Sequence, residues 1–253
     1  MRDGDFRVRG KDISRVEGLS DAVFGFAITL LAISLEVPKT SGEVLHAMRG
    51  LGAFAVTFLL LFNMWRMQYT FFRRYGLDDK KVVMLTGALL FVLLLFVYPL
   101  KFIMGVMNEK LLTIAGFPDP TFDRAAVLTR HDFPVLLAAF GLGLAAVFGV
   151  FNALYRHAYS LRDSLELDAI ERFDTLEQLR ASAVVIGLGI AIGVLYLLAS
   201  AMPSAANAFE NAAAAIVIVC AVLIVRQRRT QSTRREALRR DALRREHADP
   251  ALA

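Results

Sequence analysis

Six long apolar stretches dominate this chain, and each is long enough to cross a lipid bilayer as a helix. They lie at 19–37, 51–72, 82–107, 134–155, 181–202 and 208–225. The hydrocarbon core of a bilayer is about 30 Å thick, so a helix needs about 20 apolar residues to span it. The apolar residues are continuous rather than alternating, which favours helices over the strands of a β-barrel. We therefore predict an all-α integral membrane protein with six transmembrane helices.

The composition agrees with this class. Hydrophobic residues make up 56% of the chain and the mean hydropathy is +0.50, which excludes an ordinary soluble domain. The connections between the stretches are too short for a separate soluble domain. The sequence therefore predicts a single membrane domain over 1–253, with a basic tail at 226–253.

The Lys and Arg residues predict the orientation, because positive residues are retained on the cytoplasmic side. Twenty-two of them precede the first stretch, follow the last, or lie after the second and fourth stretches, and only five lie in the other connections. With six crossings, both termini are expected to be cytoplasmic. The net charge of +5 and the pI of about 9.5 follow from this topology, so we predict no nucleic-acid partner. The tail is expected to contact anionic lipid headgroups.

The residues needed for common enzymatic sites are missing from the apolar stretches. The four histidines lie outside these stretches or at their edges, and the single cysteine, Cys220, lies inside the sixth. No spacing of His or Cys is typical of a metal site, and no glycine loop follows a strand. We therefore predict no catalytic residue, no metal and no cofactor.

One helical face of the first stretch is apolar. Phe26, Leu30 and Ile33 are spaced by four and three residues, so they share a face that Thr29 adjoins. Packing against neighbouring helices is the ordinary explanation of such a face. The alternative is that copies of this face surround a common axis.

Polar residues also mark the start of the first stretch, where Arg15, Ser20 and Asp21 lie within seven positions. Serine or aspartate at this point is typical of a helix cap. The alternative is a buried polar network in which they join Trp65 and Gln68 of the second stretch, since polar groups at that depth are costly unless paired.

The run Arg15-x-x-x-Leu19-Ser20-Asp21-x-x-x-Gly25 resembles the R-x-x-x-F-S-D-x-x-x-A signature of the transmembrane protein 175 family. This family comprises endosomal and lysosomal potassium channels and prokaryotic relatives. Leu19 and Gly25 depart from the signature. Trp65 matches a Trp-x-x-His pattern in the second helix of the family, but Gln68 replaces its histidine. A proline near the end of the third helix is similar to Pro99.

The resemblance implies a potassium channel whose first helix lines a central pore, formed by a homotetramer of single-repeat subunits. Phe26 stands at the apolar constriction of the family and Thr29 at its threonine, with Leu30 and Ile33 as further pore-lining positions. Arg15, Ser20, Asp21, Trp65 and Gln68 would form a structural polar network. A hydrophobic ring gates by dewetting, and potassium is the expected permeant ion.

The expected location is the cell (inner) membrane, as a multi-pass protein. Two other functions stay open at this stage. The bundle could be a non-conducting interaction or sensing protein, or a secondary transporter. The transporter is the less favoured of the two, because no charged residue lies at mid-membrane.

Overall fold

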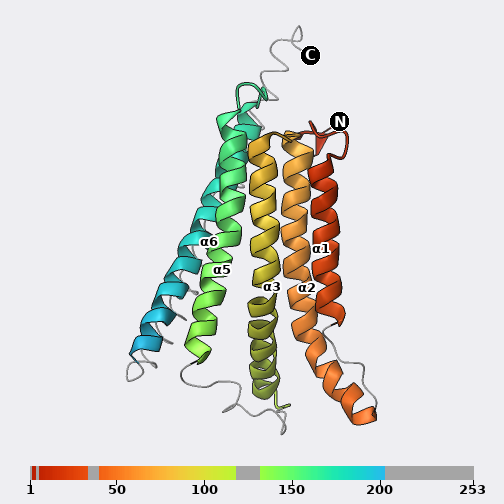
Figure 1. Cartoon of the computed structure of the whole chain (residues 1–253), viewed down its shortest axis with the longest axis vertical. Coiled ribbons are helices and arrows are strands. Elements are labelled where there is room, and N and C mark those ends of the chain that lie inside the picture. The colour runs from red at the N-terminus through yellow and green to blue at the C-terminus, as the bar shows by residue number, and fades with distance from the viewer. Residues whose placement is uncertain (1, 4–5, 34–39, 118–131, 203–253) are drawn as a thin grey trace.

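The computed structural model describes residues 2–3, 6–33, 40–117 and 132–202, most of which lie in long helices (Figure 1). The helices are α1 (Arg15–Ile33), α2 (Ser41–Tyr75), α3 (Lys80–Ile114), α5 (Asp132–Ser160) and α6 (Ala169–Ala201). Before α1, two short strands, β1 (Arg2–Asp3) and β2 (Phe6–Arg7), pair antiparallel. The predicted all-α class is confirmed.

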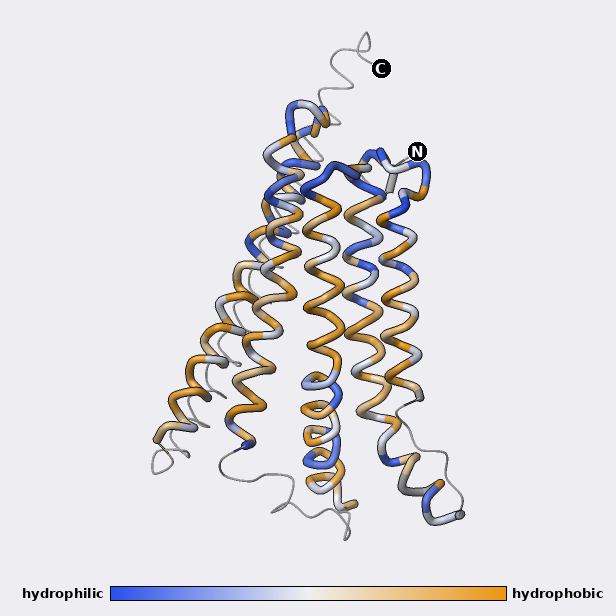
Figure 2. Tube along the Cα trace, in the orientation of Figure 1, coloured by the Kyte–Doolittle hydropathy of each residue, from blue (hydrophilic) through white to orange (hydrophobic). Residues whose placement is uncertain are grey.

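The helices stand side by side in one elongated bundle. Helices α1, α2 and α3 form a row, and α5 and α6 pack together beside α3 and lean away from the row at the lower end (Figure 1). Apolar residues follow most of the length of the helices, and hydrophilic residues gather at the upper end and again on the lower parts of α2 and α3 (Figure 2). A helix satisfies its own backbone polar groups, which makes this arrangement suitable for a bilayer.

The predicted count of six transmembrane helices is wrong. The described residues form five helices, and four of them, α2, α3, α5 and α6, are long and apolar enough to cross a membrane. Helix α1 carries three charged residues, Arg15, Glu17 and Asp21, within its 19 residues. The stretch predicted at 208–225 lies outside the described residues. The described residues therefore do not supply the six crossings that were expected to agree with two cytoplasmic termini.

Local signals set the ends of the helices at one end of the bundle. Helix α2 ends at Tyr75 because Gly76 adopts a left-handed conformation, with φ of 61°, that favours glycine. The side chain of Asp79 caps α3, and Asp168 forms a capping box with Glu171 at the start of α6. The helices consequently begin and end several residues beyond the apolar stretches.

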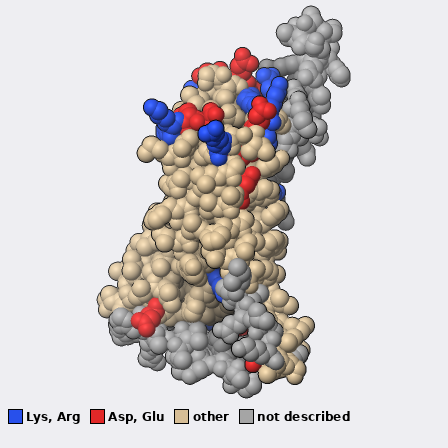
Figure 3. Space-filling view, turned by 45° about the vertical axis from the view of Figure 1, so that its right-hand side comes forward, with Lys and Arg blue, Asp and Glu red and all other residues tan. Residues whose placement is uncertain are grey.

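We call this end of the bundle the polar end. It holds the segment before α1, the α2–α3 connection at 76–79 and the α5–α6 connection at 161–168 (Figure 1). Most Lys, Arg, Asp and Glu residues visible in Figure 3 lie at this end. The bundle therefore has one strongly ionic end, and the zone below it carries few charges.

The main core lies among α1, α2, α3 and α5. Its largest fully buried apolar side chains are Phe6, Phe24, Leu31, Leu61, Phe71, Tyr75, Leu89, Leu93, Leu100, Phe151 and Leu154. Several rings meet edge to face, including Phe71 and Tyr75 with Tyr155. Such contacts add to the burial of apolar area.

Helices α5 and α6 approach each other closely at glycines. A Cβ atom on Gly189 would lie 2.6 Å from the Gly141 carbonyl oxygen and 2.8 Å from the Ala145 nitrogen. Both neighbours are backbone atoms, so they cannot move aside as a side chain does. Small residues allow this contact, as in other membrane helix pairs.

We predict that Gly189→Ala separates α5 from α6 and destabilises the protein by about 1–3 kcal/mol. Gly187→Ala is the matched control on the same helix, because a Cβ there would meet nothing within 4 Å. Thermal unfolding of the purified protein measures both. Equal stability of the two variants would contradict the close contact.

Candidate functional site

Helix α1 has two distinct faces. Its buried face packs against α2 and α3 and consists of Glu17, Ser20, Phe24, Ala27 and Leu31. Its exposed face consists of Leu19, Ala22, Gly25, Phe26 and Thr29. Because α1 stands at the outer edge of the row (Figure 1), no described part of the chain covers the exposed face.

The structure divides the predicted apolar stripe. Phe26 is 56% exposed, and Thr29 is exposed on the same face, with its Oγ1 donating to the Gly25 carbonyl oxygen at 2.9 Å. Leu30 is half-buried, and Ile33 is the last residue of α1. Phe26 and Thr29 therefore share the exposed face, while Leu30 turns partly toward the bundle.

Helix α1 is capped by a residue that the sequence did not indicate. The Ser14 hydroxyl accepts a hydrogen bond from the Glu17 backbone nitrogen at 3.2 Å, which is the geometry of an N-cap. Ser20 and Asp21 lie more than a turn inside the helix. The cap interpretation therefore does not apply to Ser20 or Asp21.

Asp21 connects α1 to α2. The Trp65 Nε1 donates a hydrogen bond to Asp21 Oδ1 at 2.8 Å. Trp65 also belongs to a series of aromatic contacts along α2 that runs from Phe54 through Phe58 and Phe62 to Tyr69. The indole therefore joins Asp21 of α1 to an aromatic edge of α2.

The other predicted polar residues do not join this bond. Ser20 and Gln68 are buried, at 1% and 2% exposure, and their side-chain polar atoms have no hydrogen-bond partner among the described residues. Arg15 is exposed at the first residue of α1. Of the five residues predicted to form a network, the structure brings Asp21 and Trp65 into direct contact.

A second link between α1 and α2 is ionic, and the sequence did not reveal it. Arg73 Nη2 donates to Glu17 Oε1 at 2.7 Å. The two side chains are only 17% and 5% exposed, so water screens the ion pair weakly. In the sequence, Arg73 is counted only among the basic residues between the second and third stretches. The structure shows that it lies in the last turn of α2 and pairs with Glu17 in the first turn of α1.

Residues 6–14 form a segment that we call the N-terminal strap. It lies across the polar end and leads directly into α1 (Figure 1). The backbone nitrogens of Arg9 and Gly10 both donate to the Arg73 carbonyl oxygen at 3.1 Å. Phe6 is buried against Tyr75, with the Arg74 guanidinium 4.8 Å from the centre of its ring. The strap therefore donates hydrogen bonds to a free carbonyl oxygen at the end of α2 and covers this end of the helix.

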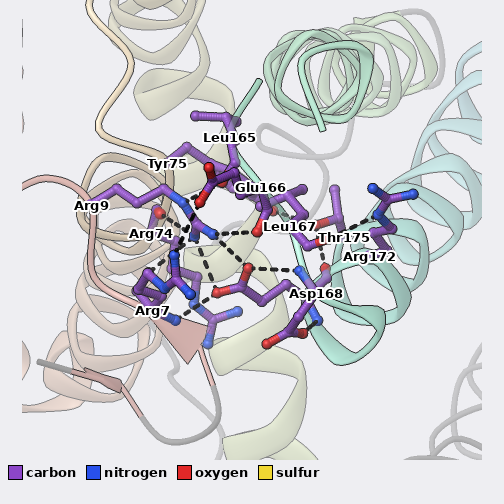
Figure 4. Close-up of polar contacts among 11 residues, drawn as sticks. Arg7, Arg9, Arg74, Tyr75, Leu165, Glu166, Leu167, Asp168, Arg172 and Thr175 are labelled. Carbon is purple, nitrogen blue, oxygen red and sulfur yellow. Dashed lines mark hydrogen bonds and ion pairs between the residues drawn. The ribbon is translucent and has the colours of Figure 1, made fainter. Parts of the chain in front are cut away.

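The strap also binds the start of α6 through one carboxylate (Figure 4). Arg9 Nη2 donates to Glu171 Oε2 at 2.6 Å and Nη1 donates to Oε1 at 3.1 Å. The Arg7 backbone nitrogen donates to Glu171 Oε1 at 2.6 Å. A bidentate arginine pair of this kind is stronger and more directional than a neutral hydrogen bond.

The strap thus joins three helices at the point where α1 begins. The Glu171 side chain is 1% exposed, so its charge depends on Arg9 for compensation. The surrounding hydrogen bonds hold the carboxylate in one position (Figure 4). Any movement of the start of α1 relative to α6 must break these contacts.

We predict that Glu171→Gln destabilises the protein by about 3–5 kcal/mol, because Arg9 loses its carboxylate partner in a buried site. The control is Glu166→Gln, which removes an exposed partner of Arg7 at 3.6 Å. Thermal unfolding should show a large loss for the first variant and almost none for the second. Similar midpoints would show that the strap contributes little to stability.

Comparison with known proteins identifies the group to which this bundle belongs. Residues 15–97, from the first residue of α1 into α3, match the family described as the endosomal/lysosomal potassium channel TMEM175. A protein from Marivirga tractuosa named as a potassium channel is 38% identical over 178 residues, which are 70% of this chain and 72% of the relative. The chain belongs to the TMEM175 family.

Two further proteins resemble this TMEM175 chain. A potassium channel of Streptomyces collinus is 28% identical over 140 residues, 53% of this chain and 62% of the relative. The crystal structure of a variant of the potassium channel MtTMEM175, in complex with a nanobody–MBP fusion protein, covers 90% of this chain and 97% of its own. That match has a TM-score of 0.78 and 31% sequence identity.

Membership in the TMEM175 family confirms the resemblance drawn from the signature in α1. It also confirms a multi-pass membrane protein, and a family of channels rather than of enzymes. Within the described ranges, no group of three or more His, Cys, Asp or Glu side chains could hold a metal ion. The roles of individual site residues remain predictions.

Proposed function

We propose that four copies of this chain form a potassium channel in the cell membrane, with the exposed face of α1 lining the pore. The relatives from Marivirga tractuosa and Streptomyces collinus are named as potassium channels, which supports this class of function. The observation that carries the proposal is the exposed face of α1, on which Phe26 is 56% exposed.

The charged residues of α1 favour a position away from lipid. Arg15 and Asp21 are exposed on α1, and charged side chains facing hydrocarbon are strongly unfavourable. At a central axis, the same residues would meet water or another subunit. Helix α1 is also the one described helix that is not among the four candidate membrane spans.

Phe26 would form the constriction of the pore. It lies 11 residues after Arg15, which places it about 16 Å along the helix from the polar end. Four phenylalanine side chains at one level form an apolar ring, and such a ring gates by excluding water. Leu30 and Ile33 would extend the apolar surface beyond the ring.

Thr29 would supply the polar ring next to this constriction. Its Oγ1 donates to the Gly25 carbonyl oxygen, so the lone pairs of the hydroxyl oxygen remain available to an ion. Four hydroxyl oxygens replace part of the hydration shell of a potassium ion. The preference for potassium would then depend on the width of the pore at this level.

The polar network holds the pore helix in place. The bond from Trp65 to Asp21 fixes α1 against α2, and Ser20 and Gln68 belong to the same three-helix interior. Arg15 lies at the mouth of the proposed pore at the polar end. The tail at 226–253 lies outside the described residues, and its arginines would contact anionic headgroups.

We predict that Phe26→Ala increases potassium flux several-fold in proteoliposomes, because a smaller ring admits water more readily. Phe91→Ala is the control, since Phe91 is 65% exposed on α3, a helix that faces lipid in this proposal. Flux that stays at background in the Phe26 variant, with assembled protein verified, would overturn the pore assignment.

We also predict that Thr29→Val reduces the ratio of potassium to sodium flux while Thr29→Ser preserves it. Valine has nearly the shape of threonine but lacks the hydroxyl oxygen, so the comparison isolates the ion contact. Flux measurements with each cation give the ratio. An unchanged ratio in the valine variant would assign selectivity to another part of the pore.

A further inference from the structure

Four polar atoms lie without partners inside the three-helix interior of α1, α2 and α3. They are Ser20 Oγ, Gln68 Nε2, Gln68 Oε1 and Thr86 Oγ1, which have no hydrogen-bond partner in the described part of the chain. Ser20 is 1% exposed, Gln68 2% and Thr86 0%. The sequence did not indicate Thr86 at all.

Ser20 and Gln68 lie at the same depth. Helices α1 and α2 run antiparallel, and two contacts fix their register: Glu17 meets Arg73, and Asp21 meets Trp65. On α1, Ser20 lies between Glu17 and Asp21. On α2, Gln68 lies between Trp65 and Arg73. Both side chains are buried, so both point into the interior rather than toward the exposed face of α1.

Thr86 lies at this depth on the third helix. Helix α2 ends at Tyr75 and α3 begins at Lys80, both at the polar end. Gln68 precedes the end of α2 by seven residues and Thr86 follows the start of α3 by six. With a rise of about 1.5 Å per residue, the two lie about 10 Å and 9 Å below the polar end. The three buried side chains therefore lie at about the same depth, and we call them the polar layer.

Inside a membrane bundle, the polar atoms of such a layer have few possible hydrogen-bond partners. A hydroxyl can turn to a carbonyl of its own helix, as Thr57 does by donating to the Ala53 oxygen at 2.7 Å. The Gln68 amide has two donor hydrogens and an acceptor oxygen, and the interior of an intact helix has no free backbone N–H that could donate to this oxygen. An amide that is buried without partners is strongly unfavourable.

We propose that the layer formed by Ser20, Gln68 and Thr86 is a binding site for one or two internal water molecules. Water both donates and accepts, so one molecule joins an amide to a hydroxyl that lies beyond direct hydrogen-bond distance. The site lies behind α1, on the side opposite Phe26. It depends on burial in the bundle and not on whether the proposed pore conducts.

The test is a double-mutant cycle on the full-length protein, with thermal unfolding as the measurement. We expect Gln68→Leu and Thr86→Val each to lower the midpoint by about 2–4 °C. The double variant should lose less than the sum of the two, because the first substitution already displaces the shared water. Thr57→Val is the control, since its hydroxyl is satisfied within α2, and its effect should add to that of Gln68→Leu.

Two results would overturn the proposal. A higher midpoint for Gln68→Leu would mean that the amide is buried dry, because removing an unpaired polar group then stabilises the protein. Strict additivity of Gln68→Leu and Thr86→Val would mean that the two side chains share no water.

A density map of the wild-type protein that resolves ordered water tests the site directly, and this test does not depend on whether a variant folds. Density within hydrogen-bond distance of the Gln68 amide and of either hydroxyl supports the site. A Gln68 amide that contacts no water in such a map rejects it.

Discussion

The hydrocarbon core of a bilayer offers no hydrogen bonds, and a polar group placed inside it needs a partner within the protein or in bound water. The backbone meets this requirement by forming helices of 29 to 35 residues in the four apolar elements. The side chains meet it by short contacts between helices, such as Tyr75 with Thr175 and Asn152 with Ser182. The contact between Trp65 and Asp21 follows the same rule.

The same constraint explains why the ion pairs concentrate at the polar end. Glu17 with Arg73 and Glu171 with Arg9 both lie where the helices leave the apolar zone. There the carboxylates are buried by protein but close to a charged surface, so each keeps a guanidinium partner. The broad zone below this end carries few charges (Figure 3), and a further ion pair, Arg49 with Glu109, lies on the halves of α2 and α3 far from the polar end.

The class of fold could be predicted from hydropathy, but the contacts of the site could not. Apolar length alone places 51–72 inside α2 and 82–107 inside α3. It overstated α1, which contains the charged residues Arg15, Glu17 and Asp21 and is not among the candidate membrane spans. The face that α1 exposes depends on how the helix is rotated against α2, and Leu30 was therefore assigned to the same face as Phe26. The partners of Glu17 and Glu171 are 56 and 162 residues away in the chain, so no local spacing reveals them.

The N-terminal strap also has a consequence for the order in which the molecule forms. Arg7 and Arg9 emerge early during synthesis, whereas Leu165 and Glu171, which they contact, emerge after the four helices α1, α2, α3 and α5. A chain is made from its first residue, and early segments begin to fold before later ones exist. The strap therefore closes only when the start of α6 has been made. Until that moment the beginning of α1 is held only by its contacts with α2, such as Glu17 with Arg73, so the link from the strap to α6 is the last of these contacts to form.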